Sequence, residues 1–178
     1  MTRHRFHGDP ARFDVLAAFV ADHFPQARYI ADVAGGQGML ARLLTKKYGF
    51  SGEVIDPRGW TLTGVAHRPS EYAAEMADYY DVVVGLHPDA ALGEVVASGM
   101  TRPTVVVPCC NFWDRAQPLG RAELLAAIGA HQVARGGGVE AVEFAFAGPK
   151  NLGLVLTPPP TGGGGVETPG RGPETTLA

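Results

Sequence analysis

Apolar residues recur along the chain with two different spacings, and together they predict an α/β fold. Helical spacing, first seen at Phe13, Leu16 and Val20, predicts helices over about 10–24, 39–48, 70–78, 90–98 and 120–133. Short apolar runs predict strands at 29–33, 53–56, 81–86, 104–107, 142–146 and 152–156. This alternation predicts a mostly parallel sheet covered by helices, with the last two strands as an antiparallel hairpin. Residues 60–67 fit either a short strand or a loop.

Composition divides the chain into one folded domain and a tail. A length of 178 residues with 46% hydrophobic content is typical of one domain with one core. From Thr157 onward proline and glycine dominate, and such a segment cannot bury enough apolar surface to offset the entropy lost on ordering. We therefore predict a domain over 1–156 and a disordered tail rich in Pro and Gly over 157–178.

Charge and cysteine content narrow the partners and the compartment. A net charge of −3 gives no chain-wide attraction for polyanions, so an RNA partner would need a local basic patch. Two adjacent cysteines cannot form a framework of long-range disulfides, which fits a reducing compartment. The chain has no apolar run of membrane-spanning length. We predict a cytoplasmic protein without membrane contact, and a homodimer stays open.

A glycine-rich turn between a predicted strand and a predicted helix is the main candidate ligand site. Asp32 precedes the turn Ala34-Gly35-Gly36-Gln37-Gly38, and Asp56 ends the next strand, where an acid can accept hydrogen bonds from both hydroxyls of a ribose. The turn lacks the spacing of a nicotinamide fingerprint and the lysine of a triphosphate loop. In the alternative interpretation these glycines only form a tight turn, and Asp56 caps the turn at 57–58.

These residues resemble the first motif of the class I S-adenosylmethionine-dependent methyltransferases. The resemblance implies a Rossmann-like class I methyltransferase sandwich and S-adenosylmethionine as the cofactor. It implies that the backbone at Gly35, Gly36 and Gly38 packs against the methionine part of the cofactor. Asp56 would then hold the ribose, and Asp32 would shape the site.

Two further clusters follow predicted buried strands, at the edge of the sheet where ligands bind in such folds. His87 and Asp89 follow one strand and are the candidate catalytic residues, with His87 also beside the cofactor; alternatively, His87 caps the next helix. Cys109, Cys110 and Asn111 follow the other strand and are candidates for substrate binding. For the cysteines, burial in the core, a thiolate nucleophile, a redox pair and a metal site with His87 and Asp89 all stay open, and no standard zinc spacing is present.

Short segments at these strand ends also resemble the tRNA uridine 2′-O-methyltransferase-like group. They are Gly-Leu-His-Pro-Asp at 85–89, Val-Val-Pro-Cys-Cys at 106–110 and, more weakly, residues 146–152. The resemblance implies an enzyme that transfers a methyl group to an oxygen or nitrogen nucleophile on RNA or on a small metabolite.

Two observations would separate the remaining functions. An RNA acceptor needs basic residues to converge on one face: Arg58, Arg68, Arg102, Arg115 and Lys150. Scattered, they favour a small-molecule acceptor. The alternative to an enzyme is a catalytically inactive cofactor-binding module that acts through a protein partner, which the lack of a clear third strand favours slightly. A nicotinamide-dependent oxidoreductase ranks last.

Overall fold

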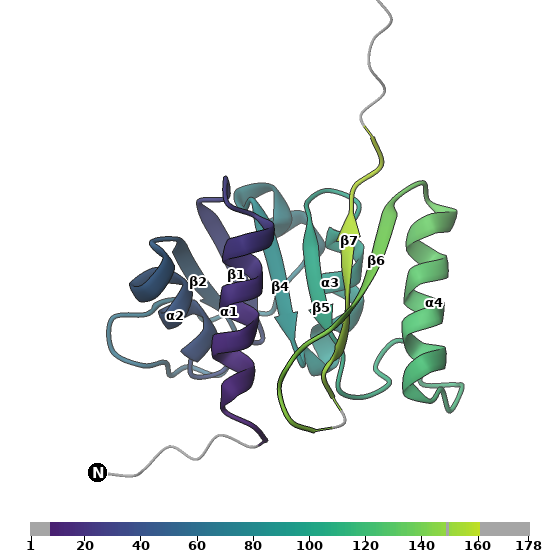
Figure 1. The fold of residues 1–178 in the computed structure, drawn as a ribbon, viewed down its shortest axis with the longest axis horizontal. Coiled ribbons are helices and arrows are strands. Elements are labelled where there is room, and N and C mark those ends of the chain that lie inside the picture. The colour runs from purple at the N-terminus through teal and green to yellow at the C-terminus, as the bar shows by residue number, and fades with distance from the viewer. Residues whose placement is uncertain (1–7, 149, 161–178) are drawn as a thin grey trace, which may run out of the picture.

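The protein is built around a seven-stranded sheet with strand order β3-β2-β1-β4-β5-β7-β6 (Figure 1). A computed structural model describes residues 8–148 and 150–160. The strands are β1 (Tyr29–Val33), β2 (Ser51–Ile55), β3 (Ala66–Arg68), β4 (Val82–Leu86), β5 (Thr104–Val107), β6 (Gly138–Glu143) and β7 (Leu152–Thr157). The first five strands in the chain pair in parallel, and β7 is antiparallel to both β5 and β6. The predicted mostly parallel sheet with a final antiparallel hairpin is confirmed.

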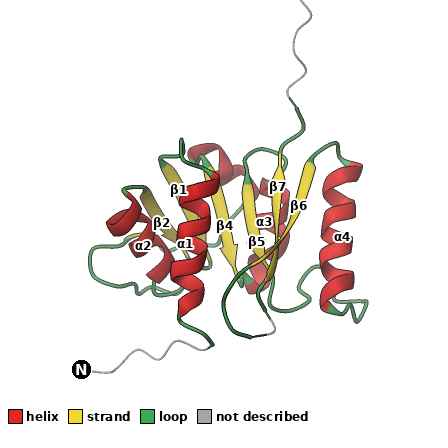
Figure 2. Cartoon of the chain, in the orientation of Figure 1, coloured by secondary structure: helices red, strands yellow, loops and turns green. Residues whose placement is uncertain are grey.

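Helices cover both faces of the sheet, because neighbouring residues on each strand point to opposite sides (Figure 2). The helices are α1 (Ala11–His23), α2 (Met39–Tyr48), α3 (Leu92–Ser98) and α4 (Arg121–Ala134), with 3-10 helices η1 (Ala74–Tyr79) and η2 (Asp89–Ala91). On β4, Val82 and Val84 pack with α1 and α2, whereas Val83 packs with α3 and α4. The core is therefore two apolar layers separated by the sheet.

Two predicted elements differ from the structure. The predicted strand 142–146 is instead β6, and it begins at Gly138, which pairs with Thr157 so closely that a Cβ on the glycine would lie 2.3 Å from the threonine Oγ1. Glycine at this position thus permits the close pairing. The predicted helix 70–78 is not formed up to Ala73, where the Tyr72 hydroxyl instead hydrogen-bonds Ser98 at 2.7 Å, and only η1 follows.

The ambiguous segment 60–67 leads into the third strand, β3, which pairs with β2. At the other end of the domain, β7 runs to Thr157, and residues 161–178 of the predicted tail lie outside the described residues. Within the described part of the chain, no helix is long and apolar enough to cross a membrane.

Gly38 is the residue that lets the chain turn from β1 into α2. Its φ of +77° lies in the left-handed region, and an added Cβ would lie 2.7 Å from Val54 and 2.8 Å from Val65. Gly49, which follows α2, has a similar φ of +78° with no atom within 4 Å of an added Cβ. The two glycines share a backbone requirement, but only Gly38 also needs the space.

Replacing Gly38 with alanine should therefore destabilise the domain more than the same change at Gly49. We expect Gly49→Ala to cost about 1 kcal/mol of unfolding free energy from backbone strain alone. Gly38→Ala adds overpacking, for a loss of about 2–4 kcal/mol. Urea denaturation of both variants measures the difference, and equal losses would contradict this packing.

Candidate functional site

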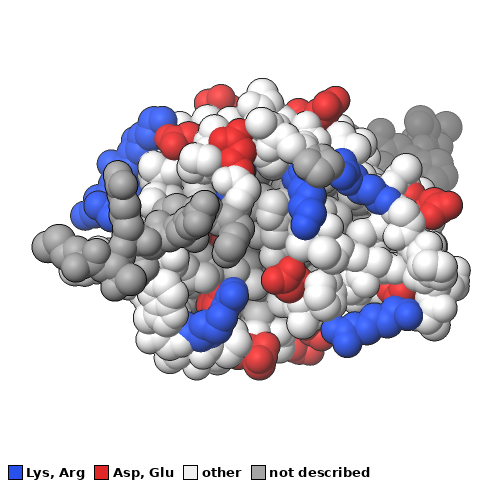
Figure 3. Space-filling view, turned by 90° about the horizontal axis from the view of Figure 1, so that it is seen from below, with Lys and Arg blue, Asp and Glu red and all other residues white. Residues whose placement is uncertain are grey.

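A cavity of about 610 Å³ opens at the carboxyl ends of the parallel strands, beside the point where the strand order reverses between β1 and β4. Its walls come from segments far apart in the sequence: parts of 8–13, 34–37, 58–60, 86–89 and 146–148, together with Lys150, Cys109 and Asp32. Figure 3 shows the molecule of Figure 1 from below, which is the side of these strand ends, and acidic and basic side chains are interspersed on this face. Ligands of α/β folds bind at such a place.

The two loops that face each other across the cavity carry unusual backbone geometry. Ala34 follows β1, and His87 and Asp89 follow β4; these are the non-glycine residues with positive φ in the described ranges. All three line the cavity. Such conformations cost free energy and persist where the surroundings impose them, which is typical of binding sites.

Asp32 lies beneath the glycine turn, almost fully buried. One carboxylate oxygen accepts a hydrogen bond from Ala41 N at 3.1 Å, at the start of α2. A Cβ on Gly35 would lie 2.5 Å from this carboxyl group, so glycine is needed for the close approach. Burial raises the pKa of Asp32 to about 7, with a further contribution from Asp56. Asp32 therefore packs directly against the turn, and its role in a cofactor site stays a prediction.

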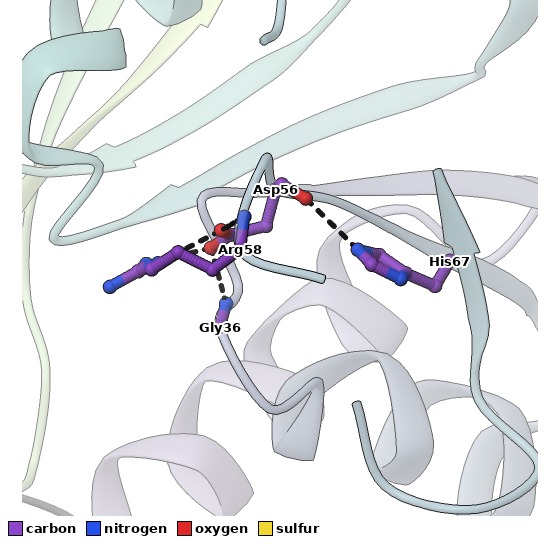
Figure 4. Close-up of polar contacts among 4 residues, drawn as sticks. All are labelled: Gly36, Asp56, Arg58 and His67. Carbon is purple, nitrogen blue, oxygen red and sulfur yellow. Dashed lines mark hydrogen bonds and ion pairs between the residues drawn. The ribbon is translucent and has the colours of Figure 1, made fainter. Parts of the chain in front are cut away.

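The carboxylate of Asp56 organises the next loop (Figure 4). Its Oδ2 accepts hydrogen bonds from Gly36 N at 2.9 Å and Arg58 Nη2 at 2.7 Å. Its Oδ1 accepts from Arg58 N and Arg58 Nε, both at 2.9 Å. Burial alone would raise the pKa of Asp56, but the hydrogen bonds from Arg58 and Gly36 outweigh it and lower the pKa.

This geometry bears directly on the predicted ribose contact. The Asp56 side chain is 0% exposed and is not among the residues that line the cavity, whereas Arg58 is. The alternative interpretation, in which Asp56 caps the turn at 57–58, describes the bond from Arg58 N. A ribose contact at Asp56 stays a prediction, and it requires the Arg58 side chain to move.

His87 is held by backbone groups on both sides and does not cap a helix. Its backbone N–H donates to Val107 O at 2.9 Å, and its ring Nε2 lies 3.2 Å from Lys150 O. Because a carbonyl oxygen only accepts, this contact places the proton on Nε2 and leaves Nδ1 as the basic nitrogen of the neutral ring. Burial lowers the pKa of His87, and the nearby charges of Arg12 and Lys150 lower it further.

The residues after β5 divide into one that faces the cavity and two that do not. Cys109 lines the cavity, and its thiol donates to Asp89 Oδ1 at 3.1 Å. Burial and this carboxylate raise the pKa of the Cys109 thiol to about 12, which disfavours a thiolate nucleophile. Cys110 is exposed, so core packing is wrong for it. Asn111 bonds to Asp114 and Gln117 within its own loop, away from the cavity.

Other open interpretations of the cysteines find no support in the described residues. Both cysteines are free thiols. No group of three or more His, Cys, Asp or Glu side chains that could hold a metal ion occurs in residues 8–148 and 150–160.

Sequence reasoning missed several residues of this site. Asp9 accepts hydrogen bonds from Ala11 N at 2.9 Å and from Ala147 N at 2.7 Å, which ties the start of α1 to the loop between β6 and β7. Arg12 and Trp60 also line the cavity. The sequence predicts the start of a helix near residue 10 but gives no sign of the contact with Ala147, because that contact joins opposite ends of the domain.

The sequence matches no family model and no curated protein. Several solved structures, however, share the fold of this chain. It is similar to the sugar N-methyltransferase KedS8 from Streptoalloteichus sp. ATCC 53650, with a TM-score of 0.54 and 15% identity over 89% of this chain and 96% of that chain. It is also similar to DesVI of Streptomyces venezuelae, with a TM-score of 0.51 and 18% identity over 84% of this chain and 91% of that chain.

A further match is the N-terminal domain of EvdMO1 in the presence of S-adenosylhomocysteine and D-fucose, with a TM-score of 0.51 and 15% identity over 86% of this chain and 83% of that chain. These likenesses confirm the Rossmann-like class I methyltransferase fold. At such low identities they show the fold alone. They give no support to the tRNA uridine 2′-O-methyltransferase-like group.

The raised pKa of Asp32 makes a prediction for stability. An acid with a higher pKa in the folded protein than in the unfolded chain stabilises the fold fully below its unfolded value of 3.8, and this contribution is lost as pH rises toward about 7. Asp32→Asn keeps an accepting oxygen without the charge. We expect the variant to gain stability relative to the native protein over that range, by on the order of 4 kcal/mol. A pH-independent difference in urea denaturation would contradict this.

The environment of His87 makes a second pH prediction. Its pKa, followed by NMR titration of the ring protons, should lie below the ordinary value of 6.5. Arg12→Gln removes a neighbouring positive charge and should raise the pKa. Arg68→Gln, outside the cavity, is the matched control and should leave it unchanged. A native pKa at or above 6.5 would show that His87 is not buried among cations.

Proposed function

We propose that the protein transfers a methyl group from S-adenosylmethionine to an oxygen or nitrogen nucleophile of a small-molecule acceptor. The observation that carries this proposal is the juxtaposition of the glycine turn after β1 and the His87 loop after β4 around one cavity. Their place at the reversal of strand order, in a sheet of class I methyltransferase topology, is where such a cofactor and its acceptor would meet.

The residues around the turn fit this cofactor, with one condition. The cavity volume lies within the range of roughly 300–1,000 Å³ for small-molecule sites. Gln37 lines the cavity, and its buried Oε1 has no hydrogen-bond partner among the described residues, so it can accept one from a ligand. The condition is that Asp56 becomes available to a ribose only when the guanidinium of Arg58 leaves it.

Each residue then has a defined task. Gly35 and Gly36 leave room for the methionine part of the cofactor, and Asp56 accepts hydrogen bonds from the ribose. Bound S-adenosylmethionine supplies an electrophilic methyl group on a sulfonium. His87, neutral at pH 7, accepts the proton of the acceptor hydroxyl or amine at Nδ1. Asp89, from the same loop, is the second candidate for assisting that deprotonation, and Cys109 contacts the acceptor. Cys110 and Asn111 would contact only an acceptor that extends beyond the cavity.

The distribution of basic residues favours a small molecule over RNA as the acceptor. Arg102 precedes β5, at the opposite edge of the sheet from the cavity, and donates to Tyr80 O at 2.9 Å. Arg68 pairs with Glu53 at 3.5 Å, and Arg115 lies over the Phe112 ring. Arg58 and Lys150 do line the cavity, but Arg58 is paired with Asp56, so the five basic residues do not form one row of unpaired cations for a polyanion. The sugar-related names of two structural neighbours agree with a small acceptor.

The lack of a clear third strand in the sequence favoured the alternative of an inactive cofactor-binding module. The structure removes that support, because the third strand is present as β3. An inactive module would bind the same cofactor but would transfer no methyl group. An acceptor screen by mass spectrometry, with His87→Ala as the matched variant, distinguishes the two functions.

The first test is ligand binding to the purified full chain. We expect saturable, one-to-one binding of S-adenosylhomocysteine by isothermal titration calorimetry, and no comparable binding of NAD, because the turn lacks the dinucleotide spacing. Circular dichroism confirms that the protein is folded. Absence of S-adenosylhomocysteine binding to folded protein would sink the proposal, and preferential binding of NAD would replace it with the oxidoreductase.

A further inference from the structure

The carboxylate of Asp56 has no accepting position left for a ligand. A carboxylate offers about four lone-pair sites. Here each oxygen accepts two hydrogen bonds, with contributions from Gly36 N, Arg58 N and two guanidinium nitrogens of Arg58. Any ligand that bonds to Asp56 must therefore displace one of these donors.

The four donors differ in how freely they can leave. The two backbone amides are fixed by the turns to which they belong, after β1 and after β2. The guanidinium is held by a flexible side chain that is 63% exposed, whereas its partner carboxylate is 0% exposed. Displacement of the guanidinium alone uncovers two accepting positions, one on each oxygen. Two vicinal hydroxyls require the same number.

A second carboxylate near Arg58 can receive the guanidinium once a ligand has displaced it from Asp56. Asp89, on the loop after β4, lines the same cavity as Arg58. Its charge already acts on the guanidinium, adding to the larger effect of Asp56 in raising the pKa of Arg58. A guanidinium that leaves Asp56 therefore remains near an anion instead of losing all ionic stabilisation.

We propose that Arg58 sets the affinity and the ligand specificity of this site by occupying the position of the ribose hydroxyls on Asp56. Binding exchanges the guanidinium for the two hydroxyls, and the released side chain turns toward Asp89. The inference rests on the proposed function, since it assigns the ribose to Asp56. It adds that the ligand must displace an existing ion pair, which lowers the observed affinity and disfavours ligands without the two hydroxyl donors.

A double-mutant cycle in the full chain tests the exchange. S-Adenosylhomocysteine binding is measured by calorimetry for the native protein, Arg58→Ala, Asp56→Ala and the double variant. Removing the competing guanidinium should tighten binding on the order of fivefold. Asp56→Ala should weaken binding more in the Arg58→Ala background than in the native one. In the native protein the gain from the ribose–Asp56 hydrogen bonds is offset by the broken Asp56–Arg58 ion pair, and in Arg58→Ala it is not. Arg58→Gln, which retains the side-chain stem, serves if the alanine variant folds poorly.

Two controls separate this effect from others. Arg68→Ala removes an exposed arginine at the end of the neighbouring strand, outside the cavity, and should leave the affinity unchanged. 5′-Methylthioadenosine has the ribose without the amino-acid part, so tighter binding of this probe by Arg58→Ala excludes an interaction of Arg58 with the ligand carboxylate.

The outcomes distinguish the two proposals. Binding that is unchanged or weaker in Arg58→Ala would overturn the exchange and leave the cofactor proposal standing. No binding of S-adenosylhomocysteine to any folded variant would overturn both.

Discussion

The saturated carboxylate of Asp56 is the interaction on which the site depends. Through Gly36 N it fixes the glycine turn after β1, and through Arg58 it closes the loop after β2. The backbone carbonyl of the same residue contacts His67 Nε2 of β3 at 2.9 Å (Figure 4). Three neighbouring strand ends are thus tied to one residue. A buried charge without these partners would be costly, so the loops and the carboxylate require one another.

The same atoms give the site a conflict between stability and binding. The hydrogen bonds that hold the loops also fill the positions that a ribose would use. The backbone amides of Gly36 and Arg58 stay on the Asp56 carboxylate, whereas the exposed side chain of Arg58 can leave it. Such an arrangement allows ligand exchange without unfolding the turn. Under the proposed function, it also explains how a fully buried acid can belong to a binding site.

The main elements of the fold follow from local sequence, because their apolar patterns are unambiguous. β1 is apolar except for Asp32, β5 is apolar except for Thr104, and their predicted bounds coincide with the structure. β6 is not predictable in this way, since it begins with Gly138 and is specified by pairing with Thr157 across the hairpin. Tyr72 and Ala74 are likewise held by tertiary hydrogen bonds to Ser98 and Glu94 of α3, which override the helical pattern of this segment.

The candidate site was predictable only in part. The positions of Asp32, His87 and Asp89 follow from strand ends, because parallel strands bring those ends to one edge. The pairing of Arg58 with Asp56 depends on loop conformation, and the link from Asp9 to Ala147 depends on contacts between opposite ends of the domain. Fold similarity does not replace such detail, because one fold can carry many functions.

The most direct measurement is a crystal structure of the full chain with S-adenosylhomocysteine. We predict the amino-acid part of the ligand against Gly35 and Gly36, both ribose hydroxyls on Asp56, and the Arg58 guanidinium turned toward Asp89. A ligand bound away from this turn would contradict the proposed cofactor site. A ligand bound there with the Asp56–Arg58 pair intact would contradict the exchange.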